Sequence, residues 1–532
     1  HGMVPLPDGT MAGYLGRIDN RARGWSFPDL SVYTATHSIK APRGVDFDAL
    51  VRDGVLVEQK VFDRMKAAVL EALSGKATPI EGVKLYPDAP GPGSARELEL
   101  RVPVPPQPGG AGPDADNGTG IVAALAGHEA ALDRLTDETF DLSDGVMPDV
   151  DNAPADECEF LLSSCQYPAG FLDGALAYQS YRETMRRLQE AAGQGDPVPI
   201  KPRFGLFVGD QIYADASAGL FDPSVRRGRF ELPYHMWLRF PYVRSVLRRI
   251  PTYMLPDDHE VTDNWEPLPN DAKNTALKEA GIDGYEKYQR GIAVAPHFHF
   301  EKDGCEFWML NTRSQREQRA AANAAAAKII DEPALAELAT QLGSRGPDAP
   351  PLFVVTPSML LPRHRRAAQW DAAESCLYSD GWDGYPLSLL HMLKHAVDNE
   401  ATNVVFLSGD EHLPCYARIE VSDTVNDRAC VLYSIHTAAA YAPFPFANGF
   451  KAQQLEQETL FFNVGATSVE YQSDKLAAEP ITASYQYQCT IEATYPPPGD
   501  AMTKIRVWKN NAHWSLRAEF GAHAAIIDNL SA

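Results

Sequence analysis

From about residue 158 onward, short apolar runs alternate with amphipathic stretches. The apolar runs are rich in β-branched and aromatic residues and are too short for helices, so they predict buried strands. The amphipathic stretches have apolar residues at helical spacing and predict helices packed against those strands. This alternation is typical of an α/β core. The predicted strands span residues 159–164, 204–208, 252–255, 306–310, 352–355 and 404–407.

After Pro414 the pattern changes to strands and turns. Residues 485–495 and 504–508 predict two strands, and the Pro-rich turn at 496–500 separates them. We interpret this part as an antiparallel extension of the same domain. Residues 320–327 predict a short Ala-rich helix.

Residues 1–155 differ from the rest of the chain. Helical periodicity over residues 46–75 is followed by a Pro/Gly-rich stretch from Pro87 to Gly120. Within that stretch, residues 97–104 alternate like an edge strand that contains a proline. We therefore predict an accessory N-terminal region of mixed helix and Pro/Gly-rich loops over residues 1–155, and a main domain over residues 156–532.

Charge and composition narrow the class of protein. The chain has 48 Lys and Arg against 71 Asp and Glu, a net charge of −23, which argues against long nucleic acids and anionic membranes as partners. No apolar run reaches the ~18 residues of a membrane-spanning helix. No signal peptide is visible, so we expect a cytoplasmic protein, or a periplasmic or secreted one if such a peptide was removed.

Acidic clusters follow three of the predicted strands. They are centred on Asp210, on Asp257 and Asp258, and on Asp410. Open α/β sheets bind ligands at the carboxyl ends of their strands, and carboxylates are almost never buried without a partner. Carboxylates that converge from three strands would repel one another, so the pattern predicts a metal site of oxygen ligands plus histidine.

Each cluster has an alternative interpretation. Asp210, followed by Tyr213, could bridge two cations or cap the next helix. Asp258 and His259 could serve a metal site or belong to a solvated acidic turn. In the third cluster, Asp410 and His412 have a spacing that lets both reach one ion, although a lone histidine is more often structural. Cys165, at the end of the first strand, is a buried hydrophobe by composition, or a thiolate ligand suited to iron or zinc.

Taken in order, these segments resemble the PhoD-like phosphatases, relatives of alkaline phosphatase D in the calcineurin-like metallophosphoesterase superfamily. The similarity covers roughly residues 158–420. The matching segments are Ser164-Cys-Gln-Tyr167, Gly209-Asp-Gln-Ile-Tyr-Ala-Asp215, Asp257-Asp-His-Glu260, Leu310-Asn-Thr-Arg313, Asp380-Gly-Trp-Asp-Gly-Tyr385 and Ser408-Gly-Asp-Glu-His412.

The resemblance implies an αββα sandwich, two β-sheets flanked by helices, with an additional N-terminal region. It also implies a ferric ion and a calcium ion, for which zinc or manganese could substitute. The ligands of the ferric ion would be Cys165, Asp210 and Tyr213. Asp210 would also face the second ion, which it would share with Asp258, Asp410 and His412.

The implied activity is the hydrolysis of small phosphate esters, monoesters or diesters, by a metal-activated water or hydroxide. His259 would steady the phosphate or protonate the leaving group, and Arg313 would offset charge on the phosphoryl oxygens. Asn311 stands where relatives often have aspartate. An alternative is therefore a catalytically degenerate protein that binds a phosphorylated ligand without hydrolysing it. A nucleotidase or nuclease is a further alternative.

Overall fold

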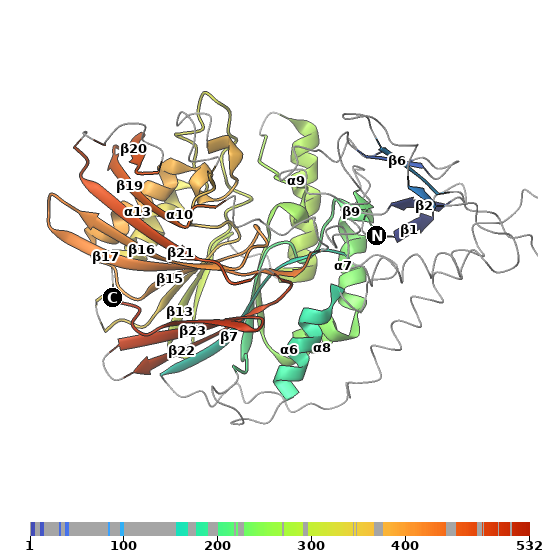
Figure 1. Ribbon diagram of the computed structural model, residues 1–532, viewed down its shortest axis with the longest axis horizontal. Coiled ribbons are helices and arrows are strands. Elements are labelled where there is room, and N and C mark those ends of the chain that lie inside the picture. The colour runs from blue at the N-terminus through green and yellow to red at the C-terminus, as the bar shows by residue number, and fades with distance from the viewer. Residues whose placement is uncertain are drawn as a thin grey trace, which may run out of the picture.

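The computed structural model describes most of residues 156–532 and six short strands before them (Figure 1). Within 156–532 the described part omits residues 169–176, 190–199, 218–219, 222–227, 269–270, 291–295, 344, 347, 366–375, 443–453, 476–480, 482–483, 498 and 511–512. The six strands are β1 (Gly2–Pro5), β2 (Met11–Tyr14), β3 (Ser31–Val32), β4 (Ser38–Ala41), β5 (Val83–Leu85) and β6 (Arg96–Leu100).

One N-terminal expectation can be compared with these strands. β6 begins within one residue of the predicted strand but ends before Pro103, and it pairs on both sides, with β4 and β5, instead of lying at an edge. The helix expected within residues 46–75 lies outside the described residues. The division into 1–155 and 156–532 stays a prediction.

A seven-stranded sheet forms one of two layers within residues 156–532. Its order is β11-β8-β7-β22-β23-β24, with β18 also paired to β7. The central strands β7 and β8 run parallel, and β22 is antiparallel to β7. The strands are β7 (Glu157–Gln166), β8 (Phe204–Val208), β11 (Thr252–Leu255), β18 (Ala439–Tyr441), β22 (Thr503–Asn510), β23 (His513–Phe520) and β24 (His523–Ile527).

A nine-stranded sheet forms the other layer, in the order β12-β13-β14-β15-β17-β16-β21-β19-β20. Strands β13, β14, β15 and β17 are parallel to their neighbours within this group. The strands are β12 (Phe298–Lys302), β13 (Cys305–Met309), β14 (Leu352–Val355), β15 (Val404–Ser408), β16 (Cys415–Asp423), β17 (Arg428–His436), β19 (Gln457–Val464), β20 (Val469–Ser473) and β21 (Tyr487–Thr494).

The two sheets pack face to face through an aromatic core. Phe160 of the first sheet lies 5.3 Å from Phe307 and 5.1 Å from Phe353 of the second, between ring centroids. Helices of the described part of the chain cover the outer faces of both sheets (Figure 1). They are α6 (Gln179–Gln189), α7 (Gly228–Arg239) and α8 (Pro241–Arg249) on one side, and α10 (Glu332–Gly343) and α13 (Pro386–Asp398) on the other. The expected αββα arrangement is confirmed.

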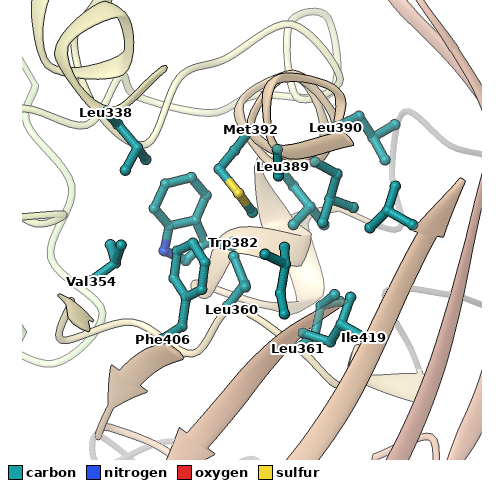
Figure 2. Close-up of a cluster of buried hydrophobic side chains, with 14 of the residues drawn as sticks. Leu338, Val354, Leu360, Leu361, Trp382, Leu389, Leu390, Met392, Phe406 and Ile419 are labelled. Atoms are coloured by element: carbon teal, nitrogen blue, oxygen red, sulfur yellow. The ribbon is translucent and has the colours of Figure 1, made fainter. Parts of the chain in front are cut away.

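Burial on both faces explains why the strands are almost continuously apolar. In β15, Val404 and Phe406 face α13, whereas Val405 and Leu407 face the other sheet. Figure 2 shows Phe406 beside Trp382 and below Met392 of α13. The strand therefore lies between two apolar layers, and polar residues occur only where it ends.

One expectation for local structure needs correction. Residues 321–326 form consecutive turns and not a helix, because the Asn323 side chain bonds to the backbone of Gln318 and Ala320. The strands predicted around the turn at 496–500 exist and are antiparallel to their neighbours, but β21 belongs to the nine-stranded sheet and β22 to the seven-stranded one. No helix among the described residues is long and apolar enough to cross a membrane.

A buried histidine in this framework gives a pH prediction. His436 ends β17 with no exposed surface, and its Nδ1 lies 3.0 Å from Ser408 Oγ. Burial lowers the pKa of His436 from 6.5 to about 3. The unfolded chain therefore takes up a proton that the folded one refuses. Above the unfolded-state pKa of 6.5, His436 causes no loss of stability. As the pH falls below that value, the free energy of unfolding decreases by up to about 1.4 kcal/mol per pH unit.

We expect His436→Gln to remove this acid-side loss, so that the stability advantage of the parent over the variant shrinks between about pH 7 and about pH 5. Urea unfolding at several pH values measures it. His523→Gln, at an exposed position of β24, is the control and should follow the parent. Parallel curves for the parent and His436→Gln would contradict the prediction.

Candidate metal centre

The acidic clusters lie at the carboxyl ends of strands from both sheets. Cys165 closes β7, and its backbone N–H donates to the Gly209 carbonyl at the end of β8 with a distance of 3.1 Å. The Asp410 N–H, just beyond β15 of the other sheet, donates to Ser164 Oγ at 3.3 Å. Segments up to 246 residues apart thus meet at one place.

The described residues contain four groups of potential metal ligands. Within each group, the ligand atoms all lie within 4.8 Å of one another. Asp210 belongs to three of them, as expected of a residue that bridges two ions. The groups are Cys165, Asp210 and His412; Asp210, Asp258 and His259; Asp210, Asp257, Asp258 and Asp410; and Asp380, Asp410 and Glu411.

The geometry brings together the residues that the sequence singled out as ligands. Tyr213 Oη lies 3.1 Å from His412 Nε2, which places both beside the Cys165 group. The resemblance placed His412 on the second ion, whereas here it shares a ligand group with Cys165 and Asp210. The assignment of ligands to individual ions stays a prediction.

Four of these residues have left-handed backbone conformations. The φ angles are 58° at Cys165, 57° at Asp210, 82° at Asp410 and 53° at His412. Such angles are uncommon outside glycine, cost of the order of 1–3 kcal/mol each and cluster at functional sites. The chain turns sharply after each strand, so side chains that would otherwise follow the sheet face are redirected toward a common point.

Gly209 makes one of these turns possible. Its φ is +97°, and a Cβ built there would lie 2.3 Å from the Cβ of Asp257. Any side chain would therefore separate the end of β8 from the end of β11. The glycine in the Gly-Asp segment is a packing requirement of the centre.

Cations fit this cluster better than the protein alone does. Within this cluster, three buried carboxylate oxygens have no hydrogen-bond partner: Oδ2 of Asp257, Oδ1 of Asp258 and Oδ2 of Asp410. Burial and the neighbouring carboxylates raise the pKa of Asp210 and that of Asp410 well above their usual range. Burial likewise raises the pKa of Asp257 to about 6, against the effect of Arg313. Hard-cation binding would satisfy these oxygens and restore their charge.

His259 is held by a residue that sequence reasoning did not assign. Its Nδ1 lies 2.8 Å from Asp215 Oδ1 and 3.0 Å from Oδ2, and its ring packs on Tyr213 with centroids 3.9 Å apart. Burial disfavours the charged ring, yet the carboxylates of Asp215 and Asp258 raise the pKa of His259 to about 9. The signal was present in the sequence, because Asp215 closes the segment that begins at Gly209.

Arg313 lies at the edge of the cluster, buried and engaged by carboxylates. Its Nε donates to Asp257 Oδ1 at 2.6 Å and its Nη2 to Asp380 Oδ2 at 2.9 Å. Asp258 Oδ1 is 3.9 Å from Nη2. The guanidinium therefore neutralises part of the carboxylate charge and aligns Asp257. Its predicted contact with substrate stays a prediction.

Glu260 organises the backbone around the centre and was also missed. Its carboxylate accepts from the N–H groups of Asp210 at 3.0 Å, Gln211 at 3.1 Å and Asp257 at 2.8 Å. A fourth bond comes from Gln289 Nε2 at 3.0 Å. Gln289 belongs to η3 (Glu286–Arg290), which continues α9 (Ala272–Tyr285). One carboxylate thus fixes the ends of both β8 and β11.

The family of the chain follows from its sequence. The model of a family described as PhoD-like phosphatase matches residues 160–459, more than half of the chain. The chain belongs to the PhoD-like phosphatase family. A solved structure titled "Structure of PhoD" is 14% identical, covers 72% of this chain and 70% of that chain, and has a TM-score of 0.46. The search of curated proteins found no match.

This membership confirms the resemblance seen in the segments and makes this PhoD-like protein a hydrolase of phosphate esters. The matched range begins in β7 and ends in β19, so it contains every residue of the four ligand groups. The cluster is a candidate metal-binding centre of Asp, Glu, His and Cys residues.

The role of Glu260 can be tested by one substitution. Glu260→Gln places an amide NH₂ where a backbone N–H must be accepted, so the segments of Asp210 and Asp257 should separate. We expect metal affinity to fall about 10–100-fold, the usual cost of losing an orienting partner. Metal titration of the stripped protein measures this. Glu279→Gln, on the exposed face of α9, should bind metal like the parent. Equal affinity in both variants would refute the role.

Proposed function

We propose that this protein hydrolyses phosphate monoesters or diesters with the help of bound metal ions. The observation that carries the proposal is the convergence of three unpartnered, buried carboxylate oxygens with Cys165 and His412 at the meeting point of the two sheets. A cluster of this kind is costly without cations. Its place at the strand ends is where α/β folds bind ligands.

The ions would be held by Asp210 as the shared residue, with Cys165, Tyr213 and His412 on one side and Asp257, Asp258 and Asp410 on the other. When bound, they would supply positive charge for phosphoryl oxygens and lower the pKa of water. The donor set combines hard oxygens with one thiolate and one imidazole, which suits iron beside a harder ion such as calcium. Zinc or manganese is the alternative.

The protein's own acid is His259. Asp215 occupies Nδ1, so Nε2 is the nitrogen left for a substrate oxygen, with Asp263 Oδ1 3.7 Å away from it. A pKa of about 9 keeps the ring protonated near neutral pH. It can then steady a phosphoryl oxygen or give a proton to the leaving group.

Asn311 does not favour a degenerate, binding-only protein. Its side-chain oxygen accepts from the backbone N–H of Arg313 at 2.9 Å and of Ser314 at 3.0 Å. The residue therefore shapes the turn that carries Arg313, a task for which an amide and a carboxylate serve equally well. A nuclease acting on long polyanions is disfavoured by the net charge of −23.

Metal dependence is tested with p-nitrophenyl phosphate and bis-p-nitrophenyl phosphate. Chelator-treated protein should lose turnover of whichever ester it cleaves and recover it when metal is returned. Asp410→Asn should lower kcat/KM by about 100-fold or more, because it removes a charged ligand. Asp427→Asn, in the exposed turn between β16 and β17, should have no effect. Full activity after complete metal removal would reject the proposal.

The pairing of Asp215 with His259 gives a second test. Asp215→Asn should lower kcat by about 100-fold, since an amide neither fixes the tautomer nor supports the charged ring. The basic limb of the pH–rate profile should move to lower pH, because the carboxylate that raises the pKa of His259 is gone. A profile that stays in place while kcat falls would argue against His259 as the acid.

A further inference from the structure

We propose that the Ser164 hydroxyl is a positioning group for the Cys165 thiolate and couples it to the backbone of Asp410. This inference rests on the proposed metal centre, in which Cys165 is a ligand. It assigns a role to a residue that touches neither substrate nor ion. Ser164 is 2% exposed and lies near the end of β7, directly before Cys165, whose φ is 58°.

The contacts of the hydroxyl join three strand ends. Its Oγ lies 2.8 Å from Cys165 Sγ, 3.3 Å from the Gly209 carbonyl oxygen and 3.3 Å from the Asp410 amide nitrogen. A longer contact of 3.5 Å reaches the Val208 carbonyl. Gly209 and Asp410 belong to the segments that provide ligands from β8 and β15. One hydroxyl is therefore in contact with all three.

Proton counting decides the direction of the bonds. A serine hydroxyl has one hydrogen to donate and can accept others. The Asp410 N–H must be the donor in its bond, so Ser164 accepts there. A metal-bound sulfur carries no hydrogen, so in that contact the serine is the donor; of the acceptors around its single hydrogen, the sulfur at 2.8 Å is nearer than the Gly209 carbonyl at 3.3 Å. The result is a chain in which the amide of Asp410 donates to Ser164 and Ser164 donates to the sulfur.

Packing keeps this hydroxyl in place. A Cβ built on Gly409 would lie 2.1 Å from Ser164 Oγ and 2.3 Å from its Cβ. Glycine at 409 thus lets β15 of one sheet approach β7 of the other closely enough for the Asp410 bond. The serine is confined between Gly409 and the end of β8, and its hydroxyl has little freedom to turn away from sulfur.

The chemical consequence concerns the sulfur lone pairs. A hydrogen bond to a thiolate stabilises its electrons, so it weakens donation to the metal and raises the energy of sulfur-to-metal charge transfer. Hydrogen bonds to sulfur ligands are among the means by which proteins tune metal centres. Loss of the Ser164 hydroxyl should therefore move such a band to longer wavelength.

The test uses full-length protein stripped of metal and titrated with Co²⁺, whose thiolate band is a spectroscopic probe independent of turnover. Cys165→Ser should abolish the band in the otherwise unchanged protein. Ser164→Ala, which keeps the Cβ beside Gly409, should shift the band to longer wavelength. Ser164→Thr restores a hydroxyl and should return the band toward the parent position. Ser163→Ala, which removes the neighbouring buried hydroxyl of β7, is the matched control and should leave it unchanged.

The outcomes separate this inference from the metal centre itself. A parent protein with no thiolate band would overturn both. A parent band that disappears in Cys165→Ser but does not move in Ser164→Ala would overturn the role of Ser164 and leave the centre standing. A shift of equal size in Ser163→Ala would show general loosening of β7 and would also overturn it.

Discussion

Mutual repulsion among buried carboxylates is the constraint on which the centre of this protein depends. Asp210, Asp257, Asp258 and Asp410 offer oxygens within 4.8 Å of one another in a region with almost no solvent access. Such a group holds its charge only with compensating positive charge nearby. Arg313 supplies one part and bound cations would supply the rest, while the backbone N–H groups of Asp210, Gln211 and Asp257 stabilise the neighbouring Glu260 carboxylate. The left-handed turns, the glycines and the arginine all serve to hold together groups that would separate if left alone.

The arrangement also explains why two sheets are needed. Cys165, Asp210 and Asp258 follow strands of the seven-stranded sheet, whereas Asp410 and His412 follow β15 of the nine-stranded one. The centre therefore lies across the edge where the layers meet, and the aromatic contacts of Phe160 with Phe307 and Phe353 keep those layers in register. Substitutions in the core between the sheets should displace the ligands. The packing of the two sheets sets the distance between the ligands of one sheet and those of the other, which are far apart along the chain.

Sequence patterns predicted the strands well and the long-range pairings poorly. Residues 204–208, 252–255 and 352–355 are strands with the expected bounds, since burial on both faces gives an apolar run that few other structures produce. The sequence around the turn between β21 and β22 does not indicate that the two strands join different sheets. In the site, the residues after each strand could be found from charge and position alone. Asp215 and Glu260 act through contacts with His259 and with backbone amides, and such contacts depend on turn geometry that spacing does not encode.

The pairing of β7 has a consequence for how the protein is made. β7 carries Cys165 and is bordered by β8 on one side and by β22 on the other, and Arg506 of β22 bonds to Glu157 of β7 across 349 residues. The ribosome releases β8 soon after β7, but β22, whose Arg506 follows Glu157 by 349 residues, emerges much later. β18 is made before β22 and pairs with Ser164 and Gln166 of β7, but until β22 follows, residues 157–162 lack a partner on that side, which invites pairing with other chains. The sheet that carries Cys165 is therefore completed only long after β7 itself has been synthesised.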